Sequence, residues 1–198
     1  MVRLFRALVV VAIASLSGCA LTSEHIDLNY TPAADVQAVP GASSIPVTVV
    51  ISDVRSTTDR VSSKVNGYGQ EMGAIISNQD VPGLVKNALE TEMHSRGYPI
   101  DASGVAVLCE IYDFYNKFQT GFWSGTAVAN VRLNIKVRNR EGSYIFSEMV
   151  RGEGRTEKIQ LATGSNAKPA LDKALRAALD ALFQRHDFYE SIQKAASK

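Results

Sequence analysis

Residues 126–138 limit the possible folds of this chain strongly, because apolar and polar side chains alternate along them. One set consists of Ala127, Ala129, Val131, Leu133, Ile135 and Val137, and the other includes Asn130, Arg132, Asn134, Lys136 and Arg138. Successive side chains of a strand point to opposite faces. Alternation of this kind is typical of an antiparallel strand with one face in the core and one in water. The chain must therefore supply a second layer that covers the apolar face.

Further strands are expected on both sides of this stretch. Residues 105–118 should form a hairpin with it, and Glu141-Gly142 turns the chain into a third long strand. Earlier in the chain, Asn66-Gly67 between two short apolar runs indicates a small hairpin. The predicted strands are therefore 47–53, 105–118, 126–138 and 143–157, with the small hairpin at 64–77.

Two amphipathic helices are expected to form the covering layer. The first is capped by Asp80 and ends at Gly97, and its apolar residues recur at helical spacings. The second opens near Asn166 and has one apolar side up to Phe183, and a further helical turn is expected at 187–192. Since each helix has one apolar face, both need the same sheet. We therefore predict an α+β fold, a two-layer sandwich in which a mostly antiparallel sheet of about four strands plus a small hairpin carries two amphipathic helices on one face.

The first twenty residues have the composition of a targeting segment. Arg3 and Arg6 precede an apolar run over 7–16, which is too short to span a bilayer that needs about 20 residues. Leu16-Ser17-Gly18-Cys19 then matches a lipobox, in which a peptidase cuts before a cysteine that carries lipid. Three acyl chains, at about 0.8 kcal/mol for each buried CH₂, hold a protein on a membrane far more firmly than one chain. We predict a lipoprotein signal peptide at 1–18 and N-acyl and S-diacylglycerol lipid on Cys19, with an ordinary secretory signal as the alternative.

The segment that follows has no sustained periodicity and is interrupted by Pro32, Pro40 and Gly41. We predict that 19–45 comprises the lipidated cysteine and a flexible tether, with a reach of roughly 25–30 Å. Residues 26–30 could instead pair with a sheet edge. The remainder, 46–198, is predicted to be a single periplasmic α+β domain.

Charge and cysteine content exclude some classes of function. Lys and Arg number 21 against 20 Asp and Glu, and loss of residues 1–18 leaves 19 against 20. A protein so close to neutral is not a general nucleic-acid binder. Cys109 lies in the apolar run 107–111, where a cysteine behaves as a small buried hydrophobe rather than a reactive thiol.

The chain contains no recognisable catalytic constellation. His25, His94 and His186 show no metal-ligand spacing, and no Gly-x-Ser-x-Gly motif is present. We therefore predict a protein that is not an enzyme, with no metal and no cofactor other than the lipid on Cys19.

Acidic and basic residues occur together just after the predicted strand 47–53. They could orient a polar ligand beyond the strand end, or they could be ion pairs that brace a loop. The pairs are Asp53 with Arg55 and Asp59 with Arg60.

Six aromatic residues, among them the only tryptophan, lie between residues 112 and 125 around a predicted turn. Alternation from Leu108 predicts that Tyr112, Phe114 and Phe118 point away from the core face of this arm. Exposed aromatic side chains favour contact with a protein, a sugar or a lipid interface. The alternatives are that Phe122 and Trp123 fold back over the open end of the sandwich, and that the neighbouring basic residues are a solvated sheet face. The candidate binding residues are Tyr112, Phe114, Phe118, Phe122, Trp123, Arg132, Lys136 and Arg138.

Several short motifs, in order along the chain, resemble the YajG-family lipoproteins of Gram-negative bacteria. They are the lipobox, the tether, Val47-Thr48-Val49 leading to Asp53-x-Arg55, Lys64-Val65, Arg96-Gly97-Tyr98 and His186-Asp187-Phe188. The resemblance implies an outer-membrane lipoprotein that faces the periplasm, and it brings no catalytic site. Ala20, in place of Asp, follows the cysteine and agrees with outer-membrane sorting.

The sequence thus leads to a non-catalytic outer-membrane lipoprotein whose periplasmic domain binds another cell-envelope protein in an accessory or assembly role. The alternative is a module that binds peptidoglycan or another glycan and tethers the outer membrane to it. The expected partners are the membrane, through the lipid anchor, and an envelope protein or peptidoglycan, but no nucleic acid.

Overall fold

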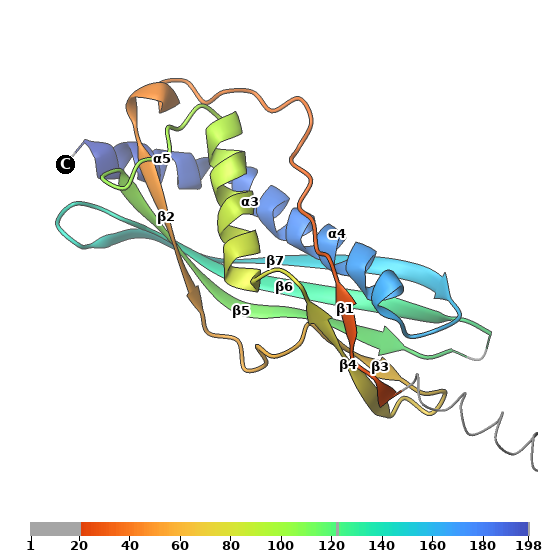
Figure 1. Cartoon of the computed structure of the whole chain (residues 1–198). Coiled ribbons are helices and arrows are strands. Elements are labelled where there is room, and N and C mark those ends of the chain that lie inside the picture. The colour runs from red at the N-terminus through yellow and green to blue at the C-terminus, as the bar shows by residue number, and fades with distance from the viewer. Residues whose placement is uncertain (1–20, 122, 198) are drawn as a thin grey trace, which may run out of the picture.

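The computed structural model describes residues 21–121 and 123–197, which form a sheet with helices on one side (Figure 1). The predicted signal peptide at 1–18, the lipidation of Cys19 and the role of Phe122 lie outside the described residues. The strands are β1 (Glu24–Ile26), β2 (Val47–Asp53), β3 (Ser62–Val65), β4 (Glu71–Ser77), β5 (Val105–Gln119), β6 (Gly125–Arg138) and β7 (Tyr144–Ile159). The helices are α3 (Val81–Ser95), α4 (Gly164–Phe183) and α5 (His186–Ala196), with a short 3₁₀ turn η1 (Ala42–Ser44).

The three long strands form an antiparallel meander, as the alternation predicts. In the β5–β6 and β6–β7 ladders, Val107 lies opposite Val137 and Leu133 lies opposite Val150. These four side chains are at most 5 % exposed, so one face of the meander is the core.

Strand β5 has two different neighbours on its other edge. Its first half pairs in parallel with β2, from Val47 opposite Val105 to Asp53 opposite Ile111. Its second half pairs in parallel with β3, where Ser62 lies opposite Asn116. Residues 54–61 connect β2 to β3 and pass the point at which β5 changes partner. The sheet order is β1-β4-β3-β5-β6-β7, with β2 beside β5.

The helices cover the apolar face of this sheet (Figure 1). Helix α4 lies directly on β7, and two glycines make that approach possible: a Cβ built on Gly152 would lie 2.0 Å from the Ala174 carbonyl oxygen, and one on Gly154 would lie 2.0 Å from the Ala170 carbonyl oxygen. None of the helices in the described ranges is both long and apolar enough to cross a membrane.

The mixed α+β class is as predicted, but the element count is not. The sheet has seven strands rather than four plus a separate hairpin, because β3 joins the predicted hairpin to β5 and β1 adds a further strand beside β4. There are three α-helices among the described residues rather than two, since the expected turn at 187–192 belongs to the 11-residue helix α5. Its Phe188 is buried against Phe183 and Phe146, which explains why this segment is ordered.

The described part of the predicted tether, residues 21–45, is packed against the domain rather than flexible. Strand β1 pairs in parallel with β4, placing Glu24 opposite Ile75, so the alternative of edge pairing applies. Leu28 is 1 % exposed, and its N–H donates to the Gln79 side chain at 2.8 Å. Burial of Ile26 and Leu28 at an otherwise open edge favours this arrangement.

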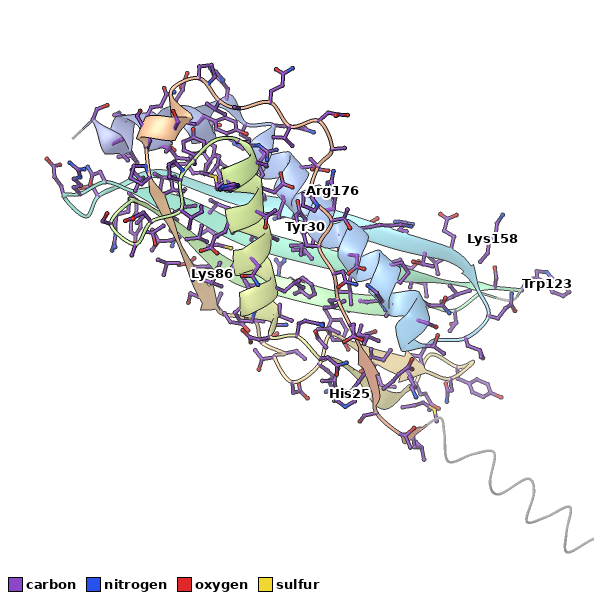
Figure 2. All side chains as sticks on the ribbon, turned by 45° about the horizontal axis from the view of Figure 1, so that its top comes forward. His25, Tyr30, Lys86, Trp123, Lys158 and Arg176 are labelled. Atoms are coloured by element: carbon purple, nitrogen blue, oxygen red, sulfur yellow. The ribbon has the colours of Figure 1, made fainter. Side chains whose placement is uncertain are left out.

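A buried carboxylate fastens the same segment to α3. Glu92 is 1 % exposed and accepts hydrogen bonds from the Tyr30 hydroxyl at 2.5 Å and the Ala33 N–H at 3.0 Å. The Arg96 guanidinium pairs with Glu92 and lies 4.0 Å from the centroid of the Phe183 ring. Figure 2 shows Tyr30 and Arg176 between the N-terminal segment and the helices. The segment therefore belongs to the helical layer.

Candidate functional site

The face of the sheet opposite the helices carries the polar half of the alternating pattern, and we call it the open face. On it, Glu110 accepts hydrogen bonds from Lys136 Nζ at 2.6 Å and Asn134 Nδ2 at 3.0 Å. These bonds hold the pKa of Glu110 below its usual range. The predicted binding residue Lys136 is therefore already paired within the sheet.

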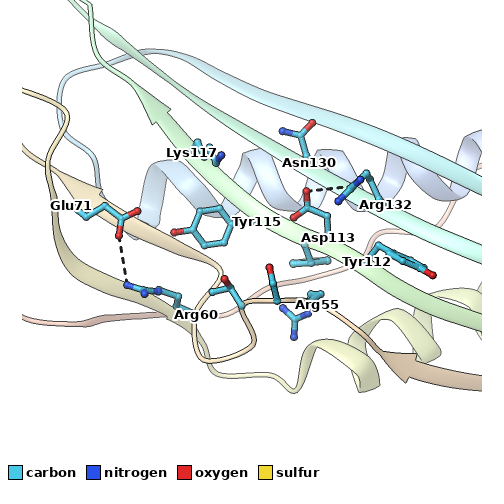
Figure 3. Close-up of a pocket in the computed structure, with 12 residues that line it drawn as sticks. Arg55, Arg60, Glu71, Tyr112, Asp113, Tyr115, Lys117, Asn130 and Arg132 are labelled. Carbon is cyan, nitrogen blue, oxygen red and sulfur yellow. Dashed lines mark ion pairs between the residues drawn. The ribbon is translucent and has the colours of Figure 1, made fainter.

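A basin of about 420 Å³ lies on the open face where β5 changes partner (Figure 3). Loop 54–61 forms one wall, and β5 and β6 form the floor. Its charged and polar lining comes from Arg55, Arg60, Glu71, Tyr112, Asp113, Tyr115, Lys117, Asn130 and Arg132. The volume is in the range of small-molecule or side-chain pockets.

Arg55 supports the loop side of the basin. Its side chain is only 4 % exposed and makes two hydrogen bonds to Asp53, from Nε at 2.8 Å and from Nη2 at 2.7 Å. The hydrogen bonds from Arg55 hold the pKa of the Asp53 carboxyl below its usual range. Arg55 Nη1 is buried without a hydrogen-bond partner in the described part of the chain. A buried donor of a charged group without a partner is costly, and no described residue relieves this cost at Arg55.

Asp113 and Arg132 form an ion pair in the floor, with 3.6 Å between Oδ2 and Nε (Figure 3). Burial raises the pKa of Asp113, although the positive charges of Arg132 and Lys117 act against that rise. Across the basin, Arg60 Nη1 lies 3.7 Å from Glu71 Oε2. The acidic groups of the basin thus each have a basic partner.

Basic side chains remain in excess on this face. Arg132 lies directly opposite Arg151 of β7 in the sheet register, and Arg151 makes no ion pair with a described residue. Like charges directly opposite each other on neighbouring strands destabilise a sheet. Lys117 also lines the basin and makes no ion pair with a described residue. This arrangement favours a ligand with negative charge.

The structure separates the predicted aromatic residues. Phe114 is 1 % exposed and cannot supply a surface contact, contrary to the prediction, whereas Phe118 packs against the core but is only partly buried. Tyr112 is 42 % exposed and lies beside the basin, whereas Trp123 is 84 % exposed at the far end of the β5–β6 hairpin. Trp123 therefore does not fold back over the core. Arg138 is exposed near the opposite end of β6 and lines a different cavity.

A β-bulge explains the error. The β5–β6 register shifts between Ile111 and Asp113, which inserts one extra residue into β5. Before the bulge the odd-numbered residues face the core, and after it Phe114 and Asn116 do. The same shift turns Asp113, Tyr115 and Lys117 to the open face. In the sequence, only the interrupted alternation of aromatic and charged residues at 112–114 indicates the bulge.

Sequence reasoning did single out Asp53 with Arg55 and Asp59 with Arg60, which flank the loop wall. It missed Tyr115, Asn130 and Glu71 as lining residues, because their proximity depends on the bulge and on β3–β4 joining the main sheet. Arg60 Nε lies 3.8 Å from Asp59 Oδ2, so both predicted pairs are ion pairs at the basin or in its loop.

The described residues hold no group of three or more His, Cys, Asp or Glu side chains arranged to bind a metal ion. Cys109 is buried and unpaired by disulfide, and burial raises the pKa of its thiol to about 12. The prediction of a buried cysteine is confirmed.

The fold and the basin together define an α+β domain whose helices cover one sheet face and whose open face presents a polar, net basic surface. A family model described as "uncharacterized lipoprotein" matches residues 32–193, and the chain belongs to this family of YajG-like lipoproteins. Membership is consistent with a membrane-anchored envelope protein. No curated protein matches the chain.

Solved structures share the fold at low sequence identity. A Xanthomonas campestris protein from a domain family of unknown function is 11 % identical, with a TM-score of 0.54 over 87 % of this chain and 92 % of that one. A Helicobacter pylori protein, named as a homolog of a neuraminyllactose-binding hemagglutinin, is 10 % identical, with a TM-score of 0.46 over 83 % of this chain and 97 % of that one. The first likeness shows the fold alone, and the second is too weak to carry an argument.

Proposed function

We propose that this protein is a non-catalytic lipoprotein, anchored by lipid on Cys19 in the outer membrane and facing the periplasm, whose domain binds another envelope protein. The open-face basin is the contact site. The partner segment that fits it is acidic and presents a carboxylate to the guanidinium groups around the basin.

The anchor is supported by the lipobox sequence before Cys19 and by membership of a lipoprotein family. Three acyl chains suffice for stable attachment. The non-catalytic role agrees with a basin whose acidic groups are engaged in ion pairs, Asp113 with Arg132 and Glu71 with Arg60.

The observation that carries the partner proposal is the unbalanced positive charge on the open face. Arg132 faces Arg151 across the β6–β7 ladder, and the buried Nη1 of Arg55 has no hydrogen-bond partner among described residues. A carboxylate beside Arg132 and Arg151 would relieve the repulsion between them. Charge-assisted hydrogen bonds between guanidinium and carboxylate are among the strongest in proteins.

A charge-reversal experiment tests this proposal. The tagged full-length protein is crosslinked to its neighbours in cells and purified, as wild type and as the double variant Arg132→Glu/Arg151→Glu. The matched control, Lys86→Glu/Lys194→Glu, reverses two charges on the helical side, in α3 and α5. We expect a discrete partner band that the open-face variant loses and the control keeps.

The two alternatives give different results. Bands that are unchanged in the open-face variant contradict the assignment of the site. Sedimentation of the purified protein with peptidoglycan, lost in Arg132→Glu/Arg151→Glu, contradicts a protein partner and supports the glycan-binding tether instead.

A further inference from the structure

Large apolar side chains are unusually exposed at one end of the molecule. Only four of the large hydrophobic residues in the described chain are more than 60 % exposed: Leu21 at 67 %, Tyr68 at 92 %, Trp123 at 84 % and Leu161 at 68 %. The next most exposed residue, Tyr144, is 55 % exposed. It lies at the start of β7, beside the turn between β6 and β7, and so at the other end of these strands.

The sheet topology brings these four residues to the same end. Tyr68 is in the β3–β4 turn, Trp123 is in the β5–β6 turn, and Leu161 follows the end of β7. A cavity of about 350 Å³ is lined by residues of all three loops, including Gly67, Trp123 and Leu161. Leu21 joins them because β1 runs parallel to β4, which starts just after Tyr68. Figure 2 shows Trp123 at the tip of this end.

Local hydrogen bonds fix the exposed position of Tyr68. The Asn66 side-chain oxygen accepts from the N–H groups of Tyr68 and Gln70, both at 3.0 Å, and the Gly69 N–H donates to the Asn66 carbonyl at 2.9 Å. Gly69 has φ of +77°, which a residue with a side chain rarely adopts. The turn is therefore built to hold Tyr68 in solvent.

The packed N-terminal segment shortens the link to the anchor. Strand β1 begins at Glu24, so four residues, or five Cα–Cα steps, separate it from Cys19. At 3.3–3.6 Å for each fully extended residue, the link spans at most about 18 Å. A flexible tether up to residue 45 would have left the domain free to rotate. With β1 in place, the end with Tyr68 and Trp123 is the one nearest to a lipid on Cys19.

We infer that this end, comprising Leu21, Tyr68, Trp123 and Leu161, docks on the phospholipid surface of the membrane that holds the lipid anchor. The inference rests on the anchor of the proposed function. Tryptophan and tyrosine favour the membrane–water interface, because their rings are apolar with one polar group. Docking at this end sets the long axis of the sheet away from the membrane and leaves the open-face basin accessible from the periplasm.

The single tryptophan makes docking directly measurable. The full-length lipidated protein is reconstituted into vesicles of phosphatidylethanolamine and phosphatidylglycerol, with and without phosphatidylcholine brominated near the glycerol end of its acyl chains. We expect a blue-shifted emission of Trp123 that brominated lipid quenches. The variant Tyr68→Ser/Leu161→Ser is expected to lose most of the quenching, while Tyr144→Ser keeps it.

The remaining outcomes distinguish failure of the lipid anchor from failure of docking. Protein that fails to float with the vesicles contradicts the Cys19 anchor and docking with it. Protein that floats but shows unquenched, solvent-like emission contradicts docking alone. A blue shift without quenching indicates contact with a second copy of the chain and also overturns docking. Unchanged thermal unfolding of Tyr68→Ser/Leu161→Ser confirms that its lost quenching is not caused by misfolding.

Discussion

The two faces of the sheet are built from the same strands but under opposite constraints. On the covered face, Val131, Leu133 and Ile135 are fully buried, and Gly152 and Gly154 admit the backbone of α4. On the open face, between the same residues, stand Arg132, Asn134 and Lys136, and two arginines lie directly opposite each other. The covered face is optimised for packing. The open face keeps an electrostatic conflict that packing does not require, and such a departure from local consistency is expected at functional sites.

The same contrast separates the two carboxylate clusters. Glu92, in the helical layer, is almost inaccessible and has hydrogen-bond partners on both oxygens. Glu110, on the open face, is paired with Lys136, and both side chains are about one quarter exposed. Burial decides how much each pair contributes to the free energy of unfolding.

Removal of a carboxylate should therefore have very different effects on the two sides. Glu92→Ala leaves Arg96 charged and buried, which is expected to cost about 3–5 kcal/mol of unfolding free energy. It should also release the N-terminal segment held by Tyr30. Glu110→Ala should cost much less, because water screens its partner. Urea unfolding of both variants measures the difference, and equal losses would contradict the contrast between the faces.

The next largest loss of stability is expected from a bulky substitution on the covered face of β7, compared with a substitution at the neighbouring residue on the open face. Gly154→Val places a side chain against the Ala170 carbonyl of α4 and should destabilise the protein by about 1–3 kcal/mol or more. Glu153→Ala, one residue away on the open face, should stay within about 0.5 kcal/mol of wild type. Thermal unfolding of the two variants measures this difference. A Gly154→Val variant as stable as wild type would contradict the close packing of α4 on β7.

The pH dependence of stability should have opposite signs for two acidic residues. Burial acts to raise the pKa of Glu92, but its hydrogen bonds to Tyr30, Ala33 and Arg96 outweigh burial and lower it below 4.5. Its stabilisation is therefore present above that pH and lost as the pH falls through the lower value in the folded protein. Burial raises the pKa of Asp113 above 3.8, so this carboxylate opposes folding at neutral pH.

Melting temperatures between pH 7 and pH 3 test these signs. Glu92→Gln should lower the melting temperature at pH 7, and its difference from wild type should shrink as the pH falls. Asp113→Asn should leave the melting temperature at pH 7 unchanged or raise it. A lower melting temperature for Asp113→Asn at pH 7 would contradict the assigned role of burial.

The smallest effect concerns the opposed arginines. Arg151→Ala removes one of two like charges and should raise the unfolding free energy by a few tenths of a kcal/mol, an effect that salt diminishes. Chemical unfolding at low and high ionic strength is the measurement. Destabilisation at low salt would show that Arg151 has a partner within the fold and is not held for a ligand.

Side-chain alternation and capping residues correctly predicted individual strands and helix ends, because neighbouring residues determine these features. The alternation of 126–138 correctly gave β6 and its core face, and Asp80 caps α3 by accepting from the Gly83 N–H at 2.9 Å. The pairing of β2 and β3 with successive halves of β5 is non-local and left no periodic signal. The tether was misjudged because its apolar anchors follow no helical or strand period, and the burial of Ile26 and Leu28 depends on the β4 edge.

The candidate site was predicted only in outline. Arg132 and Tyr112, both predicted as binding residues, lie on the open face beside the basin, whereas Phe114 and Phe118 were assigned to the wrong face. One inserted residue at the β5 bulge reverses the orientation of every later side chain in the strand. The basin itself comes from this reversal together with the loop after β2, and no linear motif encodes it.

Site-specific photo-crosslinking in living cells tests the central claim most directly, that the open face binds another envelope protein. A photoreactive residue replaces Tyr112 beside the basin or, as the control, Lys86 on the exposed side of α3 (Figure 2). We predict a discrete adduct from position 112 that contains a second protein, and none from position 86. Adducts of equal strength from both positions, or no adduct from position 112, would contradict the claim.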